Sequence, residues 1–138
     1  MSDNKKKESP VIHVKVTVST AVNPSTGEIE YIPKYHPEVI SVTEPDTILS
    51  FKLHKPTPDD VIISAVARRP ADNTQLSTPS ISTNGKMVTL TDVNTEKQTL
   101  NLDFDFASKK GGKTTMLKEP SASLLVSDYP EILNEPPP

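Results

Sequence analysis

Hydrophobic and polar residues alternate along several stretches of this chain. Between Ile12 and Ser19 every second residue is apolar, and the residues between them are polar or charged. The same period of two returns from Leu100 to Phe106, where acidic and amide side chains take the polar positions. A period of two is what a β-strand with one buried face requires. Both stretches are therefore predicted to be strands.

Shorter stretches with strand character lie between these two, separated by Pro, Asn and Gly. We find no helical period over ten or more residues, and 14 prolines also argue against helices. The pattern predicts an all-β, two-sheet antiparallel sandwich, immunoglobulin-like in layout, with about eight or nine short strands. The expected strands are residues 11–22, 28–32, 39–43 with 47–53 (two strands or one bent strand), 61–67, 80–83, 86–91, 98–107, 113–117 and 121–126.

Three local signals give finer expectations. The nearly continuous apolar run Val61–Ala67 is typical of a central strand covered on both faces. Asn84-Gly85 indicates a hairpin whose two turn residues both have positive φ, and Gly111-Gly112 indicates another hairpin. Pro33 is expected to end the short strand before it, which leaves Lys34–Pro37 as a link.

Composition sets the size and nature of the core. With 138 residues, one domain is expected. Only 4% of residues are aromatic and none is Trp, so β-branched aliphatic residues must form most of the core, with Phe51 and Phe104 buried among them. We expect a flexible polar N-terminus over 1–10, a sandwich domain over 11–127 and a Pro-rich segment over 128–138 that latches along a sheet edge.

Charge and cysteine content remove several classes of function. A net charge of −3 does not favour nucleic acid as a partner. The absence of Cys excludes disulfides, thiolate zinc sites and cysteine nucleophiles. Residues 1–10 lack the apolar region of a secretory signal, and no apolar run is long enough to span a membrane. We therefore expect a cytoplasmic protein with no membrane partner and no cofactor.

The segment Ala107–Thr114 fits a relaxed phosphate-loop pattern, in which Lys113 would contact phosphates and Thr114 would bind magnesium. That chemistry needs a helix beginning directly after the loop. Thr114 and Thr115 are poor helix formers, and Pro120 would stop any helix after one or two turns. A plain Gly-Gly hairpin is therefore predicted here.

The remaining polar candidates have structural explanations of their own. His13, His36 and His54 lack the local spacing of metal ligands: His13 is expected to be solvated and His36 to lie in a loop, and a site joining His36 to His54 requires the fold to bring them together. Asn101, Asp103 and Asp105 are expected to form an acidic stripe on a solvated face, with Asp92 near it. No serine lies in a nucleophile motif, and activity as an enzyme is not expected.

The C-terminal segment Asp128-Tyr129-Pro130-Glu131-Ile132-Leu133-Asn134-Glu135-Pro136 is the most distinctive part of the chain. It resembles the C-terminal signature of the small bacterial DP-EP family, in which an Asp-Pro element precedes an apolar pair and a Glu-Pro or Asn-x-Pro element. Here Tyr129 stands between Asp128 and Pro130, which departs from that pattern. The resemblance implies a compact β-sandwich of uncharacterised function and supplies no catalytic residues.

Two classes of function follow from these observations. The first is a non-catalytic interaction or assembly module with a protein partner or self-association, because open sheet edges invite pairing. Its candidate interaction segment contains Tyr129, Ile132 and Leu133. The alternative is a module that binds a sugar or a metal through loops 54–60 and 68–75, although a chain without Trp lacks the aromatic side chain best suited to sugars.

Overall fold

Ten strands and no helix make up the part of the chain that the structure, a computed structural model, describes: residues 9–117 and 130–138. The expected strand 121–126 lies outside these residues. The strands are β1 (Val11–Val22), β2 (Ile29–His36), β3 (Val39–Val42), β4 (Thr47–Leu53), β5 (Val61–Arg69), β6 (Ser80–Ile81), β7 (Met87–Asp92), β8 (Gln98–Lys110), β9 (Lys113–Met116) and β10 (Glu131–Asn134).

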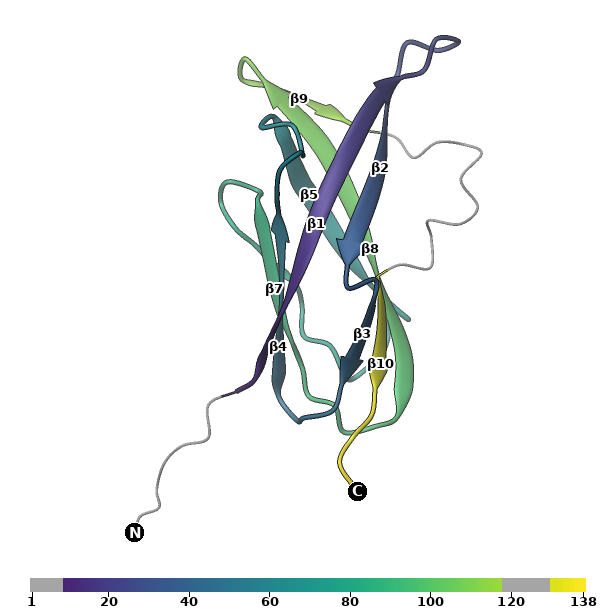
Figure 1. Cartoon of the computed structure of the whole chain (residues 1–138), viewed down its shortest axis with the longest axis vertical. Coiled ribbons are helices and arrows are strands. Elements are labelled where there is room, and N and C mark those ends of the chain that lie inside the picture. The colour runs from purple at the N-terminus through teal and green to yellow at the C-terminus, as the bar shows by residue number, and fades with distance from the viewer. Residues whose placement is uncertain (1–8, 118–129) are drawn as a thin grey trace.

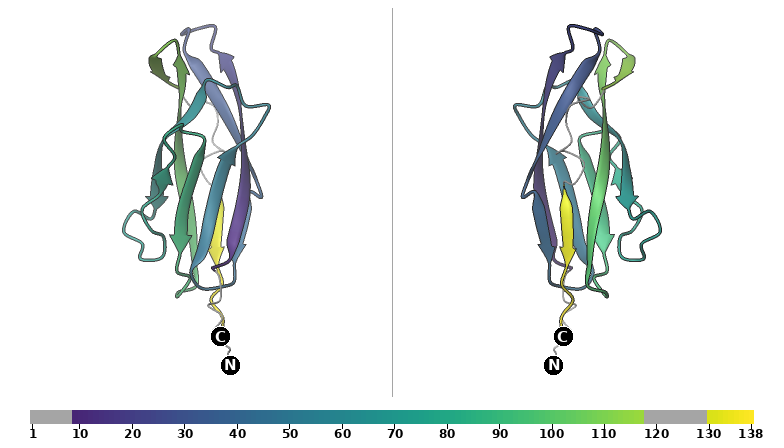
Figure 2. Two further views of the ribbon diagram at one scale, coloured as in Figure 1. Left: turned by 90° about the vertical axis from the view of Figure 1, so that its left-hand side faces the viewer. Right: turned by 90° about the vertical axis from the view of Figure 1, so that its right-hand side faces the viewer.

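The strands form two sheets packed face to face, which confirms the all-β sandwich (Figure 1; Figure 2). Sheet A has the order β2-β1-β4-β7-β6, and sheet B has the order β3-β10-β8-β5 with β9 paired to β8. Two pairs, β1 with β4 and β3 with β10, are parallel, so the sheets are mixed rather than wholly antiparallel. The parallel pairs arise where strands distant in sequence become neighbours, whereas hairpins join only antiparallel strands.

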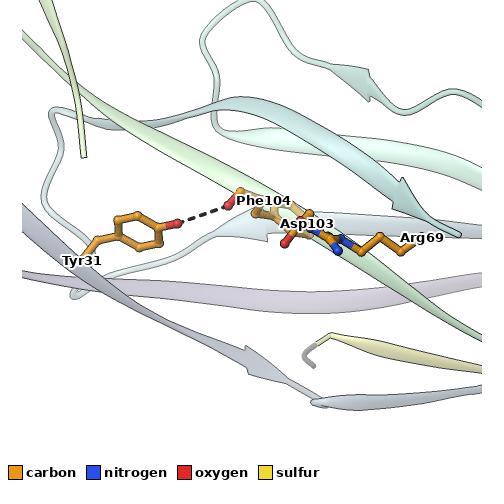
Figure 3. Close-up of polar contacts among 4 residues, drawn as sticks. All are labelled: Tyr31, Arg69, Asp103 and Phe104. Atoms are coloured by element: carbon orange, nitrogen blue, oxygen red, sulfur yellow. Dashed lines mark hydrogen bonds and ion pairs between the residues drawn. The ribbon is translucent and has the colours of Figure 1, made fainter. Parts of the chain in front are cut away.

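Aromatic rings from both sheets meet at the centre of the core. Phe51 and Phe104 are buried as predicted, with ring centroids 5.2 Å apart. Tyr31 of sheet A packs edge-to-face on Phe106 of sheet B at 5.0 Å. The Tyr31 hydroxyl also donates to the carbonyl of Phe104 at 3.4 Å, which satisfies its polar end inside the sandwich (Figure 3). These contacts join the two sheets.

Strand β2 continues through Pro33 to His36, so the expected break at this proline is wrong. Pro33 lies opposite Val18, and the Val18 N–H turns away from β2 to donate to the hydroxyl of Thr57 at 2.9 Å. Val18 and Pro33 are therefore a non-hydrogen-bonded pair of the ladder. The backbone nitrogen of Pro33, which has no hydrogen to donate, faces away from β1. A proline is tolerated there because β2 is the last strand of sheet A.

Strand β5 lies at the end of sheet B, which corrects the expected central strand, and beyond Ser64 it is covered on one face only. Val61 and Ile63 are buried, but a bulge between Ile63 and Ala65 shifts the register. Beyond the bulge Ala65 and Ala67 are exposed. The continuous apolar run reflects small alanines on a solvated face, and periodicity cannot separate this case from a strand buried on both faces.

The two glycine hairpins differ from each other. Gly111 and Gly112 both have positive φ, at 56° and 78°, and close the predicted β8–β9 hairpin. In the other turn only Gly85 has positive φ, at 71°, so the expectation for Asn84 is wrong. The Gly85 N–H donates to the carbonyl of Ser82 at 2.9 Å. The Asn84 side chain accepts a hydrogen bond from the Lys86 N–H at 3.0 Å.

The C-terminal segment forms an inner strand of sheet B. β10 pairs in parallel with β3 on one side and antiparallel with β8 on the other (Figure 2). The sequence analysis expected it along a sheet edge, and the structure instead places it where its removal would separate β3 from β8. Ile132 is fully buried in the core.

A polar cluster closes the end of the sandwich near the C-terminus; its buried members are Gln75, Asp92, Asn94 and Asn134, and exposed Thr95 lies at its rim. The Asn134 side-chain amide donates to Asp92 Oδ1 at 3.0 Å and to Gln75 Oε1 at 3.3 Å. The Thr95 N–H donates to Gln75 Oε1 at 2.7 Å. The cluster thus joins β10, the end of β7 and two loops. Asp92 is buried here, rather than near the acidic stripe as expected.

Candidate interaction surface

Basic side chains gather on the outer face of sheet A, over strands β2, β1 and β4. In each strand the residues between them point into the core, as Val14 and Val16 do in β1. The alternation therefore turns every basic residue of these strands to the same side. We call this surface the basic face; its residues are His13, Lys15, Lys34, His36, Lys52 and, directly after β4, His54.

The strand register places like charges next to one another at the centre of the basic face. Lys15 lies opposite His36 in β2 and opposite Lys52 in β4. Lys34 lies opposite Thr17. None of the three lysines has an ion pair with another described residue. Like charges directly opposite each other destabilise a sheet, so the pairing of Lys15 with Lys52 is not explained by the stability of the fold.

An open hollow of about 460 Å³ lies on this face. It is lined by Lys15, Thr17, Lys34, Tyr35 and His36, with Glu38 also in its lining. Two ammonium groups, an imidazole and a hydroxyl offer donors for carboxylate oxygens. The hollow can therefore hold an acidic side chain.

The three histidines all lie on or beside the basic face. His13 is exposed, as expected, and His36 ends β2 rather than lying in a loop. His36 and His54 are on opposite sides of β1, about two strand spacings or roughly 9–10 Å apart. No group of three His, Cys, Asp or Glu that could hold a metal occurs among the described residues.

The two loops considered for ligand binding lie far apart. Loops 54–60 and 68–75 flank β5, whose nine residues extend for roughly 30 Å. The Gln75 side chain is committed to the buried polar cluster, and Arg68 donates to the carbonyl of Leu76 at 2.7 Å. The two loops therefore do not form one site.

A third polar arrangement joins Asp60 to Ser108 beside a cleft of about 440 Å³. The Ser108 hydroxyl donates to the Asp60 carboxylate, and this hydrogen bond holds the pKa of Asp60 below its usual value. A carboxylate with a lowered pKa is a weak base. The described residues that line the cleft include no histidine to activate Ser108, so the pair has the character of a structural hydrogen bond.

The outer face of sheet B carries the acidic stripe. Asp103 and Asp105 point outward from β8, with Asn101 in line with them. Asp103 forms an ion pair with Arg69 of β5, in which Arg69 Nε donates at 2.7 Å (Figure 3). Asp105 has no ion pair with another described residue. The stripe is therefore only partly neutralised.

The candidate interaction segment divides between the core and the surface. Tyr129 lies outside the described residues. Ile132 is enclosed between the sheets, and Leu133 is half-buried on the outer face of sheet B opposite Thr99 and Ser41. In this structure only Leu133 of the two described residues is accessible to a partner.

Comparison with known families places this fold. The sequence profile of the DP-EP family matches residues 10–136. The chain belongs to the DP-EP family. The match covers all ten strands, so the DP-EP family relation extends over the whole sandwich and is not confined to the C-terminal signature that first indicated it.

Other comparisons add little to the DP-EP assignment. The crystal structure of the inclusion body protein PixA from Burkholderia cenocepacia J2315 shares 8% identity with this chain, at a TM-score of 0.42, over 98% of each chain. No curated protein matches this DP-EP sequence. Within residues 9–117 and 130–138, the structure has no helix long and apolar enough to cross a membrane.

Sequence reasoning did not find the basic face of this DP-EP protein. Its residues come from three separate strands, and each lysine alone is an ordinary polar residue of an alternating pattern. The sequence shows only that these residues are at outward positions of their strands. Lys15 and Lys52 become neighbours through the parallel pairing of β1 and β4. Long-range pairing of this kind has no local sequence signature.

Proposed function

We propose that this protein is a non-catalytic interaction module that binds an acidic protein surface on its basic face. The observation that carries the proposal is the surroundings of Lys15. Its direct cross-strand neighbours are His36 and Lys52, and it forms no ion pair with a described carboxylate. A chain with a net charge of −3 has more acidic than basic residues with which to occupy such positions. An anionic partner would offset the repulsion that the fold leaves in place.

A protein suits this face better than a nucleic acid. Proteins that bind DNA tightly make about 6–10 phosphate contacts, largely through Lys and Arg. The basic face offers three lysines and no arginine, and the whole chain is acidic. Exposed Ile32 on the same face adds an apolar contact of the kind found in protein interfaces.

Titration with a fluorescent deca-glutamate peptide at low salt tests the proposal. Saturable binding is expected, and the double variant Lys15→Glu/Lys52→Glu should weaken it by at least about tenfold, because both substitutions introduce repulsion at the centre of the face. Both side chains are exposed, so the variant should fold.

The matched control is Lys97→Glu/Lys113→Glu, which makes the same change in net charge at a loop and at a hairpin strand away from the basic face. It should lower binding only by the small amount that total charge explains. Equal loss in both double variants, or tighter binding of a DNA duplex than of the peptide, would contradict a specific protein-binding face.

A further inference from the structure

The outer face of sheet B carries carboxylates at its centre, whereas its cations are Arg69 and, towards β9, Lys109. We call it the acidic face and define it by Asp103 and Asp105 in β8 and Glu131 in β10. Arg69 neutralises Asp103 (Figure 3). Asp105 and Glu131 have no ion pair with another described residue. The acidic face therefore carries two carboxylates that no cation among the described residues neutralises.

Several outward positions of the acidic face carry short side chains. Ala65 and Ala67 of β5 lie opposite Asp105 and Asp103, and Ser41 of β3 is also exposed. Short side chains allow another sheet to approach closely, and lysine arms from that sheet can then reach the carboxylates. Val39, 40% exposed at the end strand, supplies an apolar contact comparable to Ile32 on the basic face, which is 47% exposed.

The two faces lie on opposite sides of the sandwich, because each is the outer surface of one sheet (Figure 2). A two-fold dimer through either surface would place like charges against each other. A contact between the basic face of one copy and the acidic face of the next is attractive, and it leaves one unused face at each end. Such a heterologous contact does not close and continues by adding copies.

We infer that the partner of the basic face is a second copy of this chain, bound through its acidic face in a head-to-tail stack. This inference rests on the proposed function, since it uses the same basic face and names its partner. At most four strands of sheet B lie side by side, so its face is about 19 Å wide, and over about 20 Å of strand it covers roughly 380 Å². That is below the roughly 800 Å² per partner of a standard stable interface. The stack is therefore weak and depends on salt.

Sedimentation velocity of the full chain over a range of concentrations tests the stack. At about 20 mM NaCl the average mass should rise above 15.1 kDa as concentration increases, and about 0.5 M NaCl should return it to the monomer because salt screens the facing charges. A monomer at every concentration in low salt would overturn the inference.

Two charge-reversal variants identify the faces. Lys15→Glu/Lys52→Glu and Asp105→Lys/Glu131→Lys should each lower the association constant by at least about tenfold. An equimolar mixture of the two should associate again, because the first retains a native acidic face and the second a native basic face. The control Lys97→Glu/Lys113→Glu has the same net charge as the first variant and should still associate.

Thermal melts followed by circular dichroism confirm that each variant is folded, and Asp105→Asn/Glu131→Gln replaces the second variant if lysine at position 131 disturbs β10. Association that survives both reversals, or a mixture that remains monomeric, contradicts the head-to-tail contact. If the chain is monomeric but binds deca-glutamate through Lys15 and Lys52, the proposed function stands and the partner is a different acidic protein. If both assays are negative, both proposals are wrong.

Discussion

At the scale of single residues, Asp92 is the most unusual side chain. It is fully buried in the polar cluster, and burial raises the pKa of its carboxyl above the usual value, although hydrogen bonds from Asn134 and Asn94 act in the opposite direction. Three buried oxygens of this cluster have no hydrogen-bond partner among the described residues: Asp92 Oδ2, Asn94 Oδ1 and Asn134 Oδ1. The cluster therefore has more hydrogen-bond acceptors than donors.

Asp92→Asn should stabilise the protein at neutral pH by about 1 kcal/mol, because it removes a buried charge and adds a donor among acceptors that lack one. Since the native pKa of Asp92 is raised, the folded state binds its proton more readily than the unfolded state. The wild-type free energy of unfolding therefore falls as pH rises from the ordinary value of about 3.9 through the raised pKa. The advantage of the variant should appear over that window and vanish below it.

Urea unfolding at pH 4 and pH 8 measures this difference, with Asp105→Asn as the control at an exposed position. A variant that is less stable than wild type by the same amount at both pH values would show that the Asp92 carboxylate is needed as an acceptor. In that case the unpartnered oxygens would be satisfied in another way, such as by buried water.

At the scale of elements, β10 holds sheet B together. It supplies both ladders between β3 and β8, and it buries Ile132 and places Asn134 in the polar cluster. Burial of the Ile132 side chain alone contributes about 1.5–3 kcal/mol, against a total stability of about 5–15 kcal/mol for a typical domain. The loss of the ladders adds to this.

A chain that ends at residue 129 should therefore be unfolded at room temperature, and it should show no cooperative transition on heating. A synthetic peptide with residues 130–138, added in excess, should restore the transition, since it can supply both ladders. The matched control peptide carries Ile132→Asp, which places a carboxylate in the core and should fail. A truncated chain that melts like the full protein would mean that β3 and β8 do not need β10.

The sequence predicts a feature of the fold well when neighbouring residues determine that feature, and poorly when strand order determines it. Alternation around Val14 and Phe104 correctly predicted buried faces, because side-chain direction follows from neighbouring residues. The extent of β2 was wrong, because Pro33 is tolerated only at an end strand, and strand order is not local. The same cause hid the candidate site: Lys15 meets Lys52 only through a parallel pair that no hairpin signal announces.

At the scale of the whole molecule, exposure differs between the two ends of the sandwich. The β1–β2 and β8–β9 hairpins extend together beyond the rest of the sandwich at the end away from the C-terminus (Figure 1). Ser19–Val22 are exposed, and β9 is exposed throughout and paired with β8. The opposite end is closed by the buried polar cluster and by β10. The basic face lies between them, over the fully buried Val14, Val16 and Phe51.

Amide hydrogen exchange should reproduce this gradient. Local opening requires less free energy where few apolar groups are buried, so amides of β9 should exchange at least about 100-fold faster than those of Leu102–Phe106 in the same hairpin. Amides of Val14–Val16 beneath the basic face should be among the slowest, because a rigid sheet holds the lysines in place before a partner binds. If β9 were as protected as the centre of β8, the hairpin end would be covered in solution. If Val14–Val16 exchanged as fast as β9, the basic face would not be a preformed surface.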